Sequence, residues 1–185
     1  MEKIKLILDE WFHSSIPELK ERNLLSVDFP EGMGVVITGV RRCGKTYTLF
    51  ELARKLRNLY PLHNIVYLNF EDERLLPLEG KEIQMLIPVI KENFKINKNK
   101  PLWLLLDEIQ VVPEWWSYVR GIIDRKEARI VVTGSSASLT LEKISSKLAG
   151  RVLIKSLYPL GFCEFLEFKG VQFKNRSLLH SLQSD

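Results

Sequence analysis

The sequence alternates short apolar runs with longer stretches of helical periodicity, and this alternation constrains the fold more than any other feature. The apolar runs lie at 35–37, 65–68, 102–106, 130–132 and 152–157. Helical stretches are expected at 3–12, 45–59, 83–94, 114–125 and 139–148. Fully apolar strands separated by helices are typical of a parallel sheet covered on both faces. The sequence therefore predicts an α/β fold with a doubly wound, five-stranded parallel sheet.

A chain of 185 residues corresponds to one compact domain of ordinary size. We expect residues 1–30 to form a helical lead-in, with a second short helix at 18–25. Residues 31–168 should form the core, and residues 169–185 the tail of a truncated C-terminal region, with a short helix or a frayed end at 173–185. The lead-in and tail should flank the core without forming domains of their own.

The composition is that of a globular protein, with 45% hydrophobic and 27% charged residues. No run approaches the roughly 18 apolar residues of a membrane span, and the N-terminus lacks the apolar core of a signal peptide. Cys43 and Cys163 are too few for a disulfide framework. We therefore expect a cytoplasmic protein with no membrane partner, whose net charge of +4 permits an anionic ligand.

A glycine-rich loop, GVRRCGKT at 39–46, connects the first predicted strand to a helix. Gly39 and Gly44 allow a backbone that curls around phosphate groups, and the following helix directs its unpaired N–H groups at the same phosphates. In this pattern Lys45 contacts the outer phosphates and the hydroxyl of Thr46 ligates magnesium. The predicted nucleotide site is completed by Val40, Arg41, Arg42, Cys43 and Tyr47.

The third predicted strand ends in two carboxylates, Asp107 and Glu108. The carboxyl ends of the strands line the ligand crevice in a doubly wound sheet, so both side chains are expected near the glycine-rich loop. Asp107 is predicted to hold Mg²⁺ and Glu108 to activate a water for attack on the γ-phosphate. Taken alone, the pair would fit an ordinary polar turn, and the upstream loop favours the catalytic interpretation.

A complete strand at 64–70 separates the glycine-rich loop from the acidic strand. The acidic strand therefore need not neighbour the first strand, which favours an ATPase with a catalytic glutamate over a GTPase. A guanine-reading N-K-x-D motif would follow the acidic strand, whereas the nearest string, at 97–100, precedes it and lacks the aspartate. We expect adenine rather than guanine as the base.

Two further polar features lie around the fifth helical stretch. Thr133 or Ser135, at the end of the fourth strand, is placed to contact the γ-phosphate or the attacking water, although capping of the next helix explains the serine equally well. Arg151 follows that helix and is a candidate catalytic cation for a neighbouring subunit's nucleotide. A salt bridge within the fold explains Arg151 nearly as well.

The motifs together resemble the prokaryotic AAA-type P-loop ATPases of the archaeal-ATPase, STAND-related group. They are GVRRCGKT (39–46), YLNFEDERL (67–75), LLLDEIQ (104–110), VTGSSAS (132–138), LAGR (148–151) and LYPLGFCEFL (157–166). The resemblance covers residues 16–168 and implies an ATPase core with strand order 5-1-4-3-2. It also implies a longer C-terminal region, commonly a winged-helix element and a nuclease-like domain, and this sequence departs from that pattern by stopping at Asp185.

The sequence thus predicts a domain that binds Mg-ATP, hydrolyses it slowly and acts as a switch for an attached or bound effector. An ATP-dependent DNA- or protein-binding module with incidental hydrolysis is the alternative. Glu108 separates the two, because a pure binding module has no use for a water-activating carboxylate. A homo-oligomer and a DNA or protein effector are the partners that this prediction leaves open.

Overall fold

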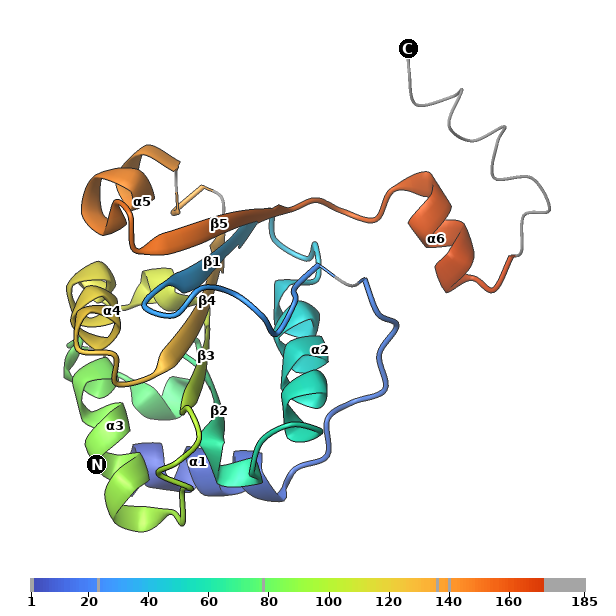
Figure 1. Cartoon of the computed structure of the whole chain (residues 1–185). Coiled ribbons are helices and arrows are strands. Elements are labelled where there is room, and N and C mark those ends of the chain that lie inside the picture. The colour runs from blue at the N-terminus through green and yellow to red at the C-terminus, as the bar shows by residue number, and fades with distance from the viewer. Residues whose placement is uncertain (1, 23, 78, 136, 140, 172–185) are drawn as a thin grey trace.

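A computed structural model of the chain describes residues 2–22, 24–77, 79–135, 137–139 and 141–171 (Figure 1). Its strands are β1 (Gly34–Gly39), β2 (Ile65–Asn69), β3 (Trp103–Asp107), β4 (Arg129–Ser135) and β5 (Val152–Leu157). All neighbouring strands run parallel, in the order β2-β3-β4-β1-β5. This order is the predicted 5-1-4-3-2 counted from the other edge, so the predicted fold is confirmed.

The helices cover both faces of the sheet (Figure 1). They are α1 (Glu2–His13), α2 (Lys45–Arg57), α3 (Lys81–Asn93), α4 (Trp115–Asp124), α5 (Leu141–Leu148) and α6 (Phe162–Phe168). In Figure 1, α2 lies on one face of the sheet, α3 and α4 lie on the other, and α6 stands away from the sheet beyond β5. Among the described residues, no helix is both long enough and apolar enough to cross a bilayer.

The lead-in differs from its prediction at one point. Helix α1 forms as expected and buries Ile4, Leu8 and Trp11. The helix expected at 18–25 is absent from its described residues, which run as an irregular strap instead. The strap is held by tertiary contacts, because the backbone N–H of Arg22 donates to Glu51 Oε2 at 2.9 Å. Weak helix propensity yields to such contacts. The short helix or frayed tail expected at 173–185 falls outside the described residues.

The sheet brings the ends of three strands to one edge. All five residues of β3 are buried, including its last residue, Asp107. Gly39 at the end of β1 lies in register with Ser135 at the end of β4. Because parallel strands share one carboxyl edge, the loop after β1 and the polar residues after β3 and β4 meet there.

Candidate functional site

The loop between β1 and α2 is built around two glycines. A Cβ atom on Gly39 would lie 2.5 Å from the carbonyl oxygen of Leu157 and 2.6 Å from Cys43 Sγ, so a side chain does not fit there. Gly44 caps α2 with φ = 101°, a left-handed conformation that favours glycine. The chain therefore turns tightly from β1 into a helix whose first N–H groups face the loop.

Lys45 carries a buried positive charge at the centre of this loop. Its side chain is 3% exposed. The ammonium lies 3.4 Å from each of the carbonyl oxygens of Gly39 and Val40. Its distance to Glu108 Oε1 is 3.5 Å. Charge-assisted hydrogen bonds ordinarily measure about 2.7–2.9 Å. The ammonium thus makes only long contacts with its acceptors, an arrangement that suits a closer anionic ligand such as a phosphate oxygen.

Thr46 and Asp107 come together beside Lys45. The hydroxyl of Thr46, in the first turn of α2, donates to Asp107 Oδ2 at 2.7 Å. Asp107 is fully buried at the end of β3. A threonine hydroxyl and a carboxylate are oxygen ligands of the kind that Mg²⁺ prefers, so the donor set fits this ion. The two residues proposed from the sequence as metal ligands are therefore in direct contact.

Two further hydroxyl groups hold Asp107. Tyr67 on β2 donates to Asp107 Oδ2 at 3.1 Å, and Thr133 on β4 donates to Asp107 Oδ1. Burial raises the pKa of the Tyr67 phenol above its usual range, and the charge of Asp107 and its hydrogen bond raise it further. The tyrosine thus remains a donor at neutral pH. Tyr67 was not identified from the sequence, because its contact with Asp107 depends on the pairing of β2 with β3.

Glu108 follows Asp107 and faces the same loop. Its backbone N–H donates to the hydroxyl of Thr133 at 3.1 Å. One carboxylate oxygen lies near Lys45, and the other accepts a hydrogen bond from Gln110 Nε2 at 2.7 Å. Of the two hydroxyls proposed for the end of β4, Thr133 is therefore the one that joins the acidic pair.

The remaining loop and strand residues lie around this centre. Ser135 ends β4 in register with Gly39, and its hydroxyl donates to Ser138 Oγ at 3.0 Å. Arg41 reaches outward to Glu71 at 3.7 Å, with 83% of its side chain exposed. Arg42 adopts φ = 65°, and Tyr47 is 55% exposed at the start of α2.

Arg151 lies at the other end of the sheet. It immediately precedes β5, and its carbonyl oxygen accepts from the N–H of Gly34, the first residue of β1. Its guanidinium Nε donates to Asp124 Oδ1 at 2.6 Å. The structure therefore contains the internal salt bridge that the sequence left open, and it separates Arg151 from the phosphate loop of its own chain by the length of β5.

Arg22 of the strap connects the loop to α6. Its guanidinium donates to the carbonyl oxygen of Cys43 at 3.1 Å and to that of Tyr158 at 3.0 Å. Two further bonds of 2.9 Å run to the carboxylate of Glu164. These bonds lower the pKa of Glu164, and a bond from the Gly161 N–H adds to the effect. The role of Arg22 was not identified from the sequence, because all of these partners except Cys43 lie more than 130 residues away.

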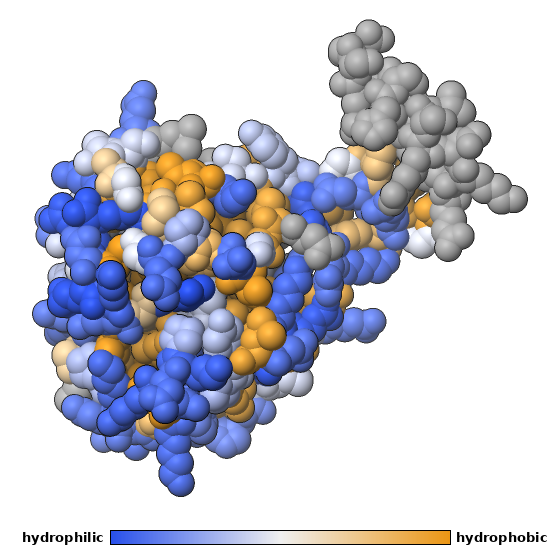
Figure 2. All heavy atoms as spheres, viewed as in Figure 1, coloured by the Kyte–Doolittle hydropathy of each residue, from blue (hydrophilic) through white to orange (hydrophobic). Residues whose placement is uncertain are grey.

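A cavity of about 370 Å³ opens between the strap, the loop and α6. Arg22, Cys43, Tyr47 and Phe168 are among its lining residues. Cavities of this size hold small organic ligands. The segment around α6 also exposes Tyr158, Phe162 and Phe165, and Figure 2 shows apolar residues there in orange.

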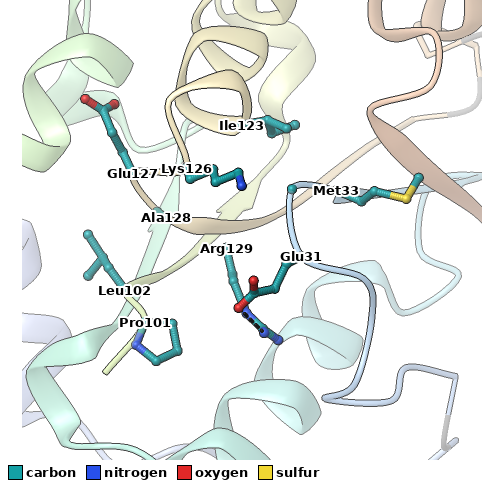
Figure 3. A pocket seen from close by; sticks show the side chains of 10 residues that line it. Glu31, Met33, Pro101, Leu102, Ile123, Lys126, Glu127, Ala128 and Arg129 are labelled. Carbon is teal, nitrogen blue, oxygen red and sulfur yellow. Dashed lines mark ion pairs between the residues drawn. The ribbon is translucent and has the colours of Figure 1, made fainter. Parts of the chain in front are cut away.

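A second cavity lies at the opposite edge of the sheet, where strands begin. Its volume is about 190 Å³, and Figure 3 shows Glu31 and Arg129 pointing toward each other across it. Their closest charged atoms are 3.7 Å apart. This cavity is remote from the glycine-rich loop and from the acidic pair. In the part of the chain that the structure describes, no three His, Cys, Asp or Glu side chains cluster as a metal site.

Comparisons with known proteins place this chain in a family. The model of the AAA domain matches residues 32–166. An uncharacterized protein of Methanocaldococcus jannaschii is 40% identical over 141 residues, which cover 76% of this chain and 30% of that protein. An uncharacterized protein of Haemophilus influenzae is 36% identical over 152 residues, covering 81% of this chain and 37% of that protein.

The chain spans about a third of the length of these curated relatives. Among solved structures, that of C. elegans PCH-2 matches with a TM-score of 0.49 and 19% identity, covering 94% of this chain and 48% of that chain. The family model covers residues 32–166 and thus most of the chain, from the residues before β1 into α6. This chain belongs to the family of AAA domains.

Proposed function

We propose that this chain binds Mg-ATP and hydrolyses it slowly. The observation that carries the proposal is the buried ammonium of Lys45, enclosed by acceptors no closer than 3.4 Å within a loop whose two ends favour glycine. Membership of the AAA family supports nucleotide binding and an ATPase-type function. Phosphate oxygens would give Lys45 the short, charge-assisted contacts that it lacks.

In this proposal the loop backbone from Gly39 to Gly44 surrounds the phosphates, and Lys45 binds the outer ones. Thr46 and Asp107 hold Mg²⁺, with Tyr67 and Thr133 keeping the carboxylate in place. When bound, Mg²⁺ neutralises charge that develops on the phosphates. The cavity beside the loop is the proposed place of the adenine base and ribose.

Glu108 is the proposed general base. A water oxygen bonds to the γ-phosphorus as the bond from that phosphorus to the bridging oxygen of ADP breaks, and the water's proton passes to the Glu108 carboxylate. The carboxylate already faces the loop, since Oε1 lies 3.5 Å from Lys45 Nζ. The products are ADP and inorganic phosphate.

The effector role is part of the same proposal. Arg22 donates hydrogen bonds both to the carbonyl oxygen of Cys43 in the phosphate loop and to Glu164 on α6. A change in the conformation of the loop would therefore be transmitted directly to α6. The exposed aromatic side chains around α6 offer a surface for an attached or bound effector. We further propose that the domain belongs to the archaeal-ATPase, STAND-related group, that it is located in the cytoplasm and that it forms homo-oligomers.

The test has two arms. A fluorescent ATP analogue with Mg²⁺ measures binding, and release of inorganic phosphate measures hydrolysis. The proposal expects saturable binding and phosphate release above a no-protein control. Binding without phosphate release would support the alternative of a nucleotide-dependent DNA- or protein-binding module, and absence of both would refute nucleotide binding.

A further inference from the structure

The two oxygens of the Glu108 carboxylate have different surroundings. Oε2 accepts a hydrogen bond of 2.7 Å from the side-chain amide of Gln110. Oε1 is the oxygen closer to the phosphate loop, 3.5 Å from Lys45 Nζ. The glutamine bond therefore leaves Oε1 directed at the loop.

A tight turn brings Gln110 to this position. Glu108 has φ = 52°, in the left-handed region that non-glycine residues rarely adopt. The short 3-10 helix η3 (Ile109–Val111) follows at once, and the N–H of Val111 donates to the carbonyl oxygen of Glu108 at 3.3 Å. This turn folds the amide of Gln110 back beside the carboxylate two residues earlier. Uncommon backbone conformations of this kind gather at functional sites.

The other end of the Gln110 amide is enclosed by β4. Oε1 of Gln110 is buried and finds no hydrogen-bond donor among the described residues. A Cβ atom on Gly134 would lie 2.3 Å from it, so glycine at this position of β4 makes room for the amide. Exchanging the amide oxygen and nitrogen would set an oxygen against the carboxylate. Oε1 of Gln110 thus accepts no hydrogen bond from the described residues, while Nε2 donates to Glu108.

We infer that Gln110 is a positioning residue, which fixes the Glu108 carboxylate so that Oε1 faces the attacking water. The inference rests on the proposed function of Glu108 as general base. The inference adds the residue that orients this general base. In other catalytic sites, too, the base that activates a nucleophile is oriented by a third group. In this inference Gln110 acts through its hydrogen bond to Glu108.

The test is a double-mutant cycle in the full chain. Gln110→Met keeps the length of the side chain and removes the donor. It should lower the single-turnover rate of ATP hydrolysis by roughly 10- to 100-fold, the range for a catalytic group that loses its orientation. The affinity for the fluorescent ATP analogue should change less than about twofold, because Gln110 orients the Glu108 carboxylate, which is proposed to act in the transition state of hydrolysis. Gln84→Met, at an exposed position of α3, is the matched control and should leave both the single-turnover rate and the binding of the ATP analogue unchanged.

The second half of the cycle uses Glu108→Gln. Adding Gln110→Met to that variant should cost less than about twofold more, because coupled residues are not additive. Equal losses in both backgrounds would show a merely structural role and overturn the inference. An unchanged rate of hydrolysis in Gln110→Met alone would also overturn the inference. Gln110→Leu, which also removes the donor and is close to glutamine in size, should behave like Gln110→Met and replaces it if Gln110→Met fails to fold.

Failure of the proposed function has a different signature. A wild-type chain that releases no phosphate would refute hydrolysis, and the side-chain amide signals of Gln110 in NMR spectra would then decide the inference. If Gln110 holds Glu108, these hydrogens exchange slowly in the wild type and rapidly in Glu108→Ala. Equal exchange in both proteins would contradict the inference.

Discussion

The ammonium of Lys45 and the carboxylate of Glu108 form a partly enclosed ion pair of 3.5 Å, with side chains 3% and 17% exposed. Each group has one task in the proposed reaction, phosphate binding for the lysine and proton acceptance for the glutamate. Without a nucleotide the two charges compensate each other across the loop. Entry of phosphate would take the lysine away from the glutamate and leave the carboxylate facing the substrate.

Lys45→Ala should weaken binding of the fluorescent ATP analogue by roughly 10- to 100-fold, the loss expected when a charge-assisted contact is removed. The fold should persist, because the ammonium that is removed makes only long polar contacts of 3.4 and 3.5 Å. Thermal unfolding checks the fold, and Lys91→Ala, at an exposed position of α3, is the matched control. Undiminished binding by Lys45→Ala would refute the assignment of the phosphate loop.

Asp107→Asn should raise the Mg²⁺ concentration needed for half-maximal ATP binding by roughly 10- to 100-fold. The amide cannot replace the charge of a carboxylate that accepts bonds from Thr46, Tyr67 and Thr133. Titration of Mg²⁺ at constant nucleotide measures the effect, with the exposed Asp28→Asn as control. An unchanged Mg²⁺ requirement would remove Asp107 from the metal site.

Arg151 should act between subunits. It lies at the start of β5, about 20 Å from the loop end of the sheet at the usual rise of a strand, too far to reach its own nucleotide. We predict that ATPase activity per molecule rises with protein concentration. Mixing Arg151→Ala with Glu108→Gln should restore activity that neither variant has alone.

Asp124→Asn separates this role from the internal salt bridge. It removes the partner of Arg151 and keeps the guanidinium, so it should preserve activity at high protein concentration. Turnover that is independent of concentration, with no rescue on mixing, would show instead that Arg151 serves the bridge to Asp124.

The bond between Arg22 and Glu164 should make stability depend on pH in acid. The bond lowers the pKa of Glu164 below its ordinary value of 4.5, so its contribution is fully present above that pH. It is lost as the pH falls through the lowered pKa and the carboxylate takes a proton. The melting temperature of wild type should therefore exceed that of Glu164→Gln at about pH 7, and the difference should shrink in acid. A difference in melting temperature that stays constant with pH would contradict the role of this bond. Glu92→Gln, at an exposed position, is the control.

Local sequence patterns predicted the sheet and the phosphate loop because both depend on short-range features. Apolar runs such as 102–106 indicate buried strands, and the loop motif at 39–46 is contiguous. Tyr67 and Arg22 were not identified, since strand pairing and the strap bring them to partners far away in the sequence. Gln110 lies only two residues from Glu108, and its role depends on the left-handed backbone of Glu108, which the sequence pattern did not indicate. The helix expected at 18–25 was wrong, because tertiary bonds such as that of the Arg22 N–H to Glu51 hold that segment in an irregular conformation.

The rate of phosphate release by wild type and by Glu108→Gln, at saturating Mg-ATP, tests the central claim most directly. Occupancy by the nucleotide must be shown equal in the two proteins. Loss of the general base should slow release by roughly 100- to 10,000-fold while the nucleotide stays bound. Equal rates in the two proteins at equal occupancy would contradict the account and leave this chain a nucleotide-binding module without a catalytic glutamate.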